Sequence, residues 1–120
     1  MILSGRLKEI IGMVPEAKTV ADIGCDHGKV AVSLVKGGKA QRAVCGDISG
    51  KSLDKARKLV NASGLSASVV LREGSGLSVL TAGEADVAVI AGMGGELIVR
   101  LLDEGADKAP GTLVLSCNKG

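Results

Sequence analysis

The chain has 120 residues, of which 46% are hydrophobic and 23% charged, and its formal net charge is +2. This composition is typical of one globular domain, and no apolar run approaches the roughly 18 to 20 residues that span a bilayer. Phe, Tyr and Trp are absent, which excludes nucleic-acid modules that bind by stacking bases on aromatic rings.

Apolar residues between positions 3 and 14 fall on one face of a predicted helix, with Ser4 available as its cap and Pro15 ending the pattern. Alternating elements follow. Strands are predicted near 19–24, 42–47, 68–72, 86–91 and 112–117. Helices are predicted near 28–37, 50–62, 75–81 and 94–104.

Strands of continuous apolar sequence, such as 86–91, are typical of a parallel sheet that helices cover on both faces. The alternation predicts right-handed crossovers and a doubly wound α/β sheet in the order 3-2-1-4-5, within one domain over residues 1–120. If the fifth strand lies at an unprotected edge of this sheet, we expect the chain to self-associate there.

Two acids are predicted to end neighbouring strands. Residues 20–28 read Val-Ala-Asp-Ile-Gly-Cys-Asp-His-Gly, so that Asp22 and a glycine turn close the first strand, and Asp47 closes the second. Open α/β sheets bind ligands at the carboxyl ends of their strands. The two strand ends therefore predict a site for a nucleoside-containing cofactor.

The acids also discriminate between cofactors. A dinucleotide site usually reads G-x-G-x-x-G, whereas Asp26 stands here at the second glycine. Asp22 and Asp26 would repel a pyrophosphate but would suit the cationic sulfonium and ammonium groups of S-adenosylmethionine, whose ribose hydroxyls could donate to Asp47. The spacing favours S-adenosylmethionine over NAD, and a sheet without a cofactor remains the other alternative.

Three cysteines, Cys25, Cys45 and Cys117, are widely spaced and form no Cys-x-x-Cys pair. This usage favours reduced thiols in the cytoplasm over a zinc site or a disulfide framework, so we expect no metal. Charged residues interrupt the apolar positions near the amino terminus, and no signal peptide or membrane partner is predicted.

Four segments, taken in order, resemble the bacterial tRNA (adenine-22-N1)-methyltransferase family. They are Leu-Ser-Gly-Arg-Leu at 3–7 with Met-Val-Pro at 13–15, the turn at 21–28, Arg-Glu-Gly-Ser-Gly-Leu at 72–77, and Ala-Gly-Met-Gly-Gly at 91–95. The last segment is the most specific, and the match spans nearly the whole chain. The resemblance implies a Rossmann-like class I fold and methyl transfer from S-adenosylmethionine to N1 of adenine 22 in tRNA.

The resemblance also implies roles for individual residues. Those implied to bind the cofactor are Asp22, Gly24, Cys25, Asp26, His27, Asp47, Ile48, Gly74, Ser75, Gly76, Ala91, Gly92 and Met93. Those implied to bind the substrate are Arg6, Gly94, Gly95 and Asn118.

Asp26 is the candidate catalytic residue, because it could accept a proton from the exocyclic amine of the target adenine. N1 of adenine already carries a free lone pair, so in-line positioning is the alternative source of the rate. His27 is the only histidine of the chain, and a catalytic role is not expected for it.

The chain departs from the family pattern at several positions. Ser75 stands where the family has Asp, Lys29 and Ala31 stand where Tyr and Pro are common, and Ser-Cys-Asn at 116–118 replaces Gln-Pro-Asn. Strands six and seven and the carboxyl-terminal helical extension of the family have no counterpart. The sequence therefore looks like an amino-terminal fragment.

Two alternatives to tRNA methylation stay open. A methyltransferase for a small molecule would tolerate the lack of aromatic residues better, and the domain could also bind the cofactor without activity. Two groups of cations are expected to be solvated, with phosphate contact as the alternative; they are Lys51, Lys55, Arg57 and Lys58, and Lys36, Lys39 and Arg42.

Overall fold

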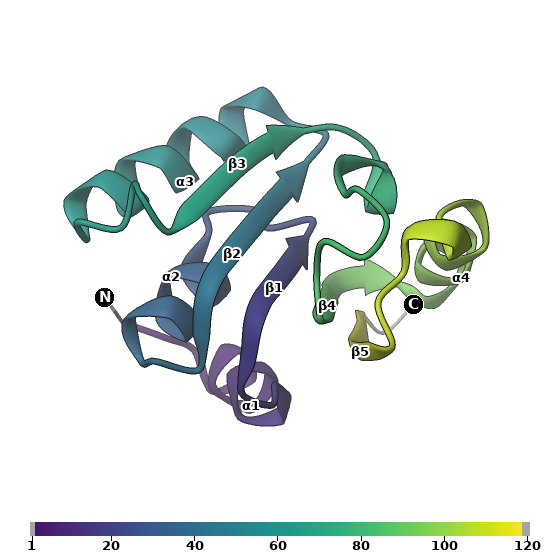
Figure 1. Cartoon of the computed structure of the whole chain (residues 1–120), viewed down its shortest axis with the longest axis horizontal. Helices are drawn as coiled ribbons and strands as arrows, with labels where there is room; N and C mark the ends of the chain where they lie inside the picture. The colour runs from purple at the N-terminus through teal and green to yellow at the C-terminus, as the bar shows by residue number, and fades with distance from the viewer. Residues whose placement is uncertain (1, 119–120) are drawn as a thin grey trace.

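A computed structural model describes residues 2–118 and contains a five-stranded parallel sheet in the order β3-β2-β1-β4-β5 (Figure 1). The strands are β1 (Ala17–Ile23), β2 (Ala40–Asp47), β3 (Val69–Glu73), β4 (Val87–Gly94) and β5 (Thr112–Asn118). The helices are α1 (Gly5–Met13), α2 (Lys29–Lys36), α3 (Gly50–Ala62) and α4 (Gly95–Glu104), with the short 3-10 helices η1 (Gly76–Val79) and η2 (Ala106–Lys108). The predicted strand order is confirmed.

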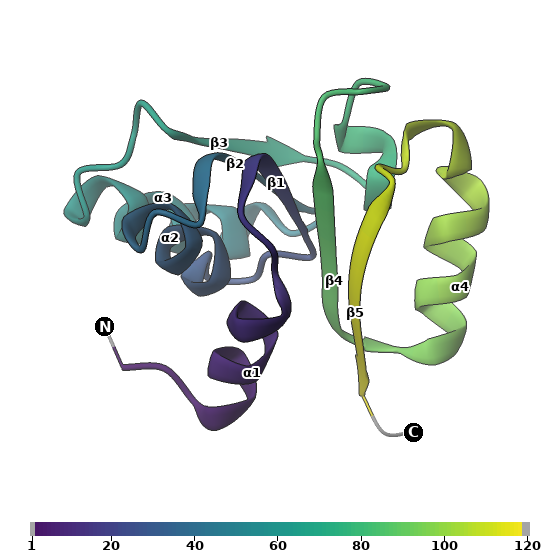
Figure 2. The same ribbon diagram turned by 60° about the horizontal axis from the view of Figure 1, so that its bottom comes forward.

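Helices cover both faces of the sheet, as the apolar strands predict. Figure 2 shows β4 and β5 between α1 on one side and α4 on the other. Along β4, Val87 and Val89 pack with α1 and α2, whereas Ala88 and Ile90 pack with α4 and η1. This alternation fills the core on both faces of β4 with aliphatic side chains.

Helix starts follow local chemistry. Ser4 caps α1 as predicted, since its hydroxyl accepts from the Leu7 N–H, and Ser49 caps α3 by accepting from the Ser52 N–H. Cys25 and Cys45 are buried, Cys117 is exposed, and all three are free thiols. No helix within residues 2–118 has the length and apolar character needed to cross a membrane.

Two predicted boundaries are wrong. The helix predicted at 75–81 is only the 3-10 helix η1, because glycines at 74 and 76 flank its start and the chain turns away after one turn. β4 runs past residue 91 to Gly94 because its pairing with β5 continues through a bulge between Ala91 and Met93. Gly92 within the bulge has a φ of 77°, a conformation that favours glycine.

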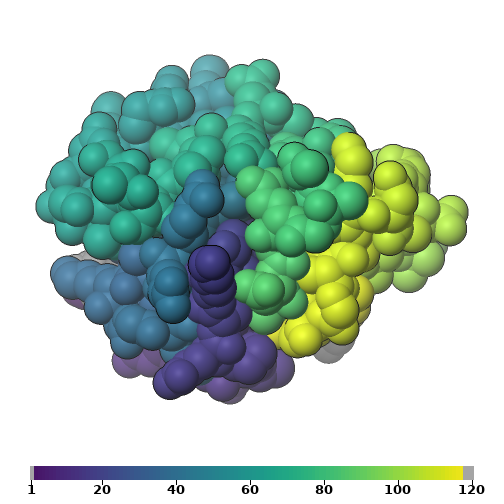
Figure 3. Space-filling view, viewed as in Figure 1, coloured from purple at the N-terminus to yellow at the C-terminus, as the bar shows by residue number. Residues whose placement is uncertain are grey.

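The strand β5 forms one edge of the sheet described over residues 2–118. Val114 is buried against α1, but Leu113 and Leu115 on the opposite face are 37% and 43% exposed. Figure 3 shows this yellow segment open to the surface beside the green of β4. Unpaired backbone groups and apolar side chains therefore meet at one edge.

We expect this 120-residue chain to self-associate through the β5 edge. Light scattering at increasing protein concentration should show a mass above that of the monomer. Leu115→Lys should lower this mass, because a charged side chain opposes edge pairing. As a control, Val99→Lys changes an exposed apolar residue of α4 and should leave the mass high. A monomer at every concentration would contradict the expectation.

Candidate active site

The carboxyl ends of β1, β2 and β4 surround a cavity of about 330 Å³, which the segment after β3 and helix α4 complete. A second cavity of about 370 Å³ adjoins it at Gly24, Ala91 and Gly92 and extends toward α1. Both lie at the edge where the sequence predicts a ligand, because the strand order reverses between β1 and β4.

The structure gathers most of the predicted cofactor residues around these two cavities. The first is lined by Gly24, Asp47, Ile48, Gly74, Ser75, Gly76, Ala91, Gly92 and Met93. The second is lined by Asp22, Gly24, Cys25, Asp26, Ala91 and Gly92, and by Arg6 of α1. His27 lies just outside, in a hollow of about 150 Å³ that it shares with Cys25 and Asp26.

The predicted substrate residues are spread over a wider area. Arg6 reaches Ser116 on β5, where its Nη2 lies 3.5 Å from the serine Oγ. Gly94 and Gly95 line a shallow hollow at the start of α4. The backbone of Asn118 pairs with Gly94, and its side chain lies outside the described residues.

Asp22 is buried, with 4% of its surface exposed, at the end of β1. Its Oδ2 atom has no hydrogen-bond partner in the part of the chain that the structure describes. Burial is the main cause that raises the pKa of Asp22 to about 7; the hydrogen bond from the Ala31 N–H opposes the shift, and the charges of Asp47 and Asp26 add to it. A cationic ligand in the second cavity would therefore stabilise the ionised carboxylate.

Asp47 joins two turns of the site. Its Oδ2 accepts from the Asp26 N–H at 3.0 Å, and its Oδ1 accepts from the Ser49 N–H at 2.9 Å. These bonds fix the carboxylate at the rim of the first cavity, beside Ile48, whose apolar side chain is 73% exposed. Ser49, and not Asp47, provides the side-chain cap of α3.

Asp26 occupies the left-handed region, with a φ of 52°, which is uncommon for a residue other than glycine. Its carboxylate is largely exposed, and its Oδ1 lies 3.5 Å from the His27 Nε2. Asp26 lines the second cavity, a position that is compatible with its predicted role as base. That role stays a prediction.

The backbone conformation of Gly24 requires glycine, and the Met93 side chain lies close beside it. Its φ is 71°, and a Cβ atom built on it would lie 2.2 Å from the Met93 Cε. The turn after β1 therefore packs directly on the end of β4.

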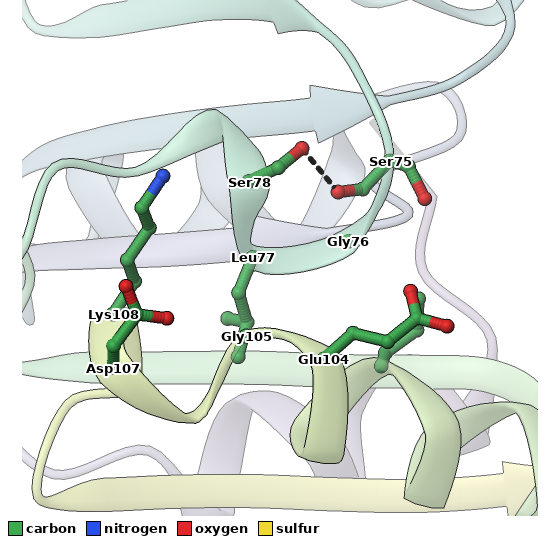
Figure 4. A pocket seen from close by; sticks show the side chains of 9 residues that line it. Ser75, Gly76, Leu77, Ser78, Glu104, Gly105, Asp107 and Lys108 are labelled. Carbon is green, nitrogen blue, oxygen red and sulfur yellow. Dashed lines mark hydrogen bonds between the residues drawn. The ribbon is translucent and has the colours of Figure 1, made fainter.

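Ser75 belongs to the segment at residues 74–80, part of which separates two cavities; we call this segment the cavity wall. Ser75 and Gly76 line both the first cavity and a further cavity of about 320 Å³ between η1 and the end of α4. Figure 4 shows the Ser78 side chain pointing to Ser75, whose carbonyl accepts from the Ser78 hydroxyl.

Helix α4 contributes lining residues that sequence reasoning missed. Leu97, Arg100 and Leu101 line the first cavity. The amphipathic pattern of α4 predicts a core face but does not show which end of that face reaches the site. Within residues 2–118, no group of three or more His, Cys, Asp or Glu side chains is arranged to hold a metal ion.

This sheet order, with acids at the first two strand ends and a cavity across the reversal, defines a Rossmann-like methyltransferase fold. The chain belongs to the methyltransferase domain family, whose match covers residues 3–120. The family relationship predicted from the four sequence segments is thereby supported at the level of the domain.

Among relatives, the tRNA (adenine(22)-N(1))-methyltransferase of Bacillus subtilis is 40% identical over 109 residues, which are 91% of this chain and 46% of that protein. The crystal structure of the B. subtilis M1A22 tRNA methyltransferase TrmK superposes with a TM-score of 0.89 at 40% identity, covering 95% of this chain and 50% of that one. The chain thus spans about half the length of the curated relative that it matches.

Two ligand complexes are also similar. A Streptococcus pneumoniae protein in complex with S-adenosyl-L-methionine has a TM-score of 0.89 at 32% identity, with 95% of this chain and 55% of that chain covered. M. capricolum TrmK in complex with S-adenosyl-homocysteine has a TM-score of 0.89 at 27% identity, with 100% of this chain and 54% of that chain covered.

The raised pKa of Asp22 makes the free energy of unfolding depend on pH. The folded state holds this proton up to a pH of about 7, whereas the unfolded carboxyl loses it near its ordinary value of 3.8. The stabilising contribution is therefore complete below that ordinary value and is lost as the pH rises through about 7.

We expect Asp22→Asn to be more stable than the unmodified chain at pH ~8, by on the order of 2 kcal/mol, because it removes a buried charge. Denaturant unfolding from acid to mildly alkaline pH should show a flatter pH dependence for this variant. Asp54→Asn, on the exposed face of α3, should keep the original slope. Parallel pH profiles for Asp22→Asn and the unmodified chain would rule out the buried charge as the cause.

Proposed function

We propose that this chain is the cofactor-binding part of a tRNA (adenine-22-N1)-methyltransferase and that it binds S-adenosylmethionine across the two adjoining cavities. The observation that carries the proposal is the pair of acids at the ends of β1 and β2. One is buried with an unpartnered oxygen, and the other is held at the cavity rim by two backbone N–H groups. The named relatives support the same assignment.

The residues present suit the cofactor part by part. Asp22 lines the second cavity, and its Oδ2 has no donor among residues 2–118, which suits the ammonium and sulfonium cations. Asp47 has lone pairs left for the two ribose hydroxyls after accepting from Asp26 and Ser49. Ile48 offers apolar cover for the adenine, and Ser75 offers a hydroxyl for its amino group.

When bound, the cofactor supplies a methyl group made electrophilic by a sulfonium. The chain itself would position the acceptor, with Arg6, Gly94, Gly95 and Asn118 as the proposed contacts. Asp26 would take the proton from the exocyclic amine of the acceptor adenine, for which its exposed carboxylate is accessible. A tRNA substrate places this activity in the cytoplasm, and no metal is required.

The proposal is tested by two measurements on the same protein, namely calorimetric binding of S-adenosylmethionine and transfer of labelled methyl to tRNA. We expect binding together with weak transfer that disappears when A22 of the tRNA is replaced by G. Weak transfer is expected because the chain has no aromatic ring for stacking and few cations for phosphates. Binding with transfer only to a small molecule, or no binding, would contradict the proposal.

Asp47→Ala should weaken S-adenosylmethionine binding far more than it weakens folding. Loss of charge-assisted hydrogen bonds to ribose should cost about 1.5 to 3 kcal/mol, or roughly ten- to a hundredfold in affinity. Calorimetric titration measures the affinity, and circular dichroism checks the fold. Asp54→Ala, which removes an exposed acid from α3, is the control. Unchanged affinity of Asp47→Ala would remove this residue from the site.

Ser75→Asp should tighten cofactor binding, because a carboxylate accepts from the adenine amino group more strongly than a hydroxyl does. The gain should be on the order of 1 kcal/mol, since desolvation of the carboxylate offsets part of it. Ser66→Asp adds the same charge on an exposed turn before β3 and should not change the affinity. Equal or weaker binding by Ser75→Asp would show that Ser75 is not at the adenine.

A further inference from the structure

An ion pair outside the cavities holds the segment that carries Ser75. The Arg72 guanidinium donates from Nη1 and Nη2 to the two carboxylate oxygens of Glu84, each at 2.7 Å. Nη1 also donates to the Val79 carbonyl at 2.8 Å, and Glu84 accepts from the Thr81 N–H at 3.0 Å. We call this four-residue arrangement the Arg72 clasp; it ties the end of β3 to both ends of residues 79–84.

The clasp lies on the α4 face of the sheet. Arg72 pairs with Gly46 of β2, which pairs in turn with Ile23 of β1, so the three residues point to the same face. Ile23 packs in the core cluster that contains α4 residues. Arg72 therefore lies on the strand next to Gly46, and its guanidinium contacts residues 79–84 on this face of the sheet.

Val79 connects the clasp to the cavity wall. A Cβ atom built on Gly46 would lie 2.7 Å from Val79 Cγ2, and one built on Gly74 would lie 2.9 Å from Val79 Cγ1. Only glycine at both positions leaves room for this side chain. Because Arg72 binds the Val79 carbonyl, it fixes how deeply Val79 sits between the two glycines.

The position of Val79 determines the position of residues 74–76, which line the first cavity. Gly74 donates its N–H to the Asp47 carbonyl at 3.0 Å, and Gly74, Ser75 and Gly76 line the first cavity together with Asp47 and Ile48. A shift of Val79 would move Gly74, and with it Ser75, relative to Asp47. The adenine end and the ribose end of the proposed cofactor site are thus coupled through one valine.

The wall has separate apolar anchors that keep it folded. Leu77 and Leu80 are buried with Ile98 and Leu101 of α4. Such contacts are non-directional, so they hold the segment on the core without fixing its backbone as closely as the hydrogen bonds of the clasp do. Hydrogen bonds from Arg72 lower the pKa of Glu84 to about 2, and the clasp is therefore ionised throughout the neutral range.

We propose that Arg72 and Glu84 are positioning residues that set the width of the cofactor cavity at Ser75, acting through Val79 and touching no ligand themselves. The inference rests on the proposed function for its ligand. Neither Arg72 nor Glu84 lines the first cavity or ends a strand at its rim.

The test compares binding of S-adenosyl-homocysteine, which is chemically stable, by calorimetry. Arg72→Met and Glu84→Gln should each weaken binding about tenfold, and the two together should weaken it no further, because either change breaks the same clasp. The exchanged pair Arg72→Glu with Glu84→Arg should bind no better than Arg72→Met, because a glutamate at 72 cannot donate to the Val79 carbonyl. Val79→Ala should weaken binding with the ion pair intact. The control is Glu16→Gln, an exposed acid before β1 at the opposite end of the sheet.

Hydrogen exchange of the Gly74 and Ser78 amides provides a readout without ligand. Both N–H groups donate within the wall, to Asp47 and Ser75, and their exchange should accelerate about tenfold in Arg72→Met while amides of β1 stay protected. Folded variants with unchanged affinity and unchanged exchange would overturn the inference. Accelerated exchange without binding by the unmodified chain would count against the proposed function and support the role of the clasp in positioning the wall.

Discussion

The carboxylate of Asp22 is buried at the end of β1 without enough hydrogen bonds to compensate for lost hydration, and the rest of the site is arranged around it. A buried charge that lacks a partner is costly, so the protein holds this group with a raised pKa. The ends of β2 and β4 and the glycine turn lie around the same point. Each of these elements leaves space beside the carboxylate and none supplies a cation to it. A buried acceptor of this kind suits a cationic ligand, which is the basis of the proposed role of Asp22.

Asp22 and Asp47 end neighbouring strands but differ in burial and in hydrogen bonding. Asp47 is one strand farther out, partly exposed, and accepts from two backbone N–H groups, so its charge is compensated locally. Asp22 is buried and pairs with Val89 of β4, which packs in the apolar core with α2. The fold thereby places a compensated acceptor and an uncompensated one within a single crevice, and these suit hydroxyl donors and a cation respectively.

The order of the strands could be predicted because apolar strands alternate with helices along the chain. Right-handed crossovers then allow few strand orders for the sheet. The sequence also predicted most residues around the cavity, because strand ends such as Asp22 and Asp47 are placed by topology alone. The contributions of Arg100 and of the Arg72 clasp were not predictable. They depend on how a long side chain or an irregular segment such as 79–84 lies across the sheet, which hydrophobic periodicity does not encode. The short helix η1 was overestimated for the same reason.

The bulge in β4 has a consequence for which side chains meet. In a regular strand, Ala91 and Met93 would point to the same face, since residues two apart do so. The bulge offsets the count by one, so Ala91 packs with the α1 side of the core, and Met93 packs with the α4 side. Met93 thereby reaches Gly24 and joins the floor of the cavity. The extra residue in the Ala-Gly-Met-Gly-Gly segment therefore decides which face of the sheet the end of β4 presents to each side. A one-residue deletion there would move the following side chains of β4 to the opposite face, up to the start of α4.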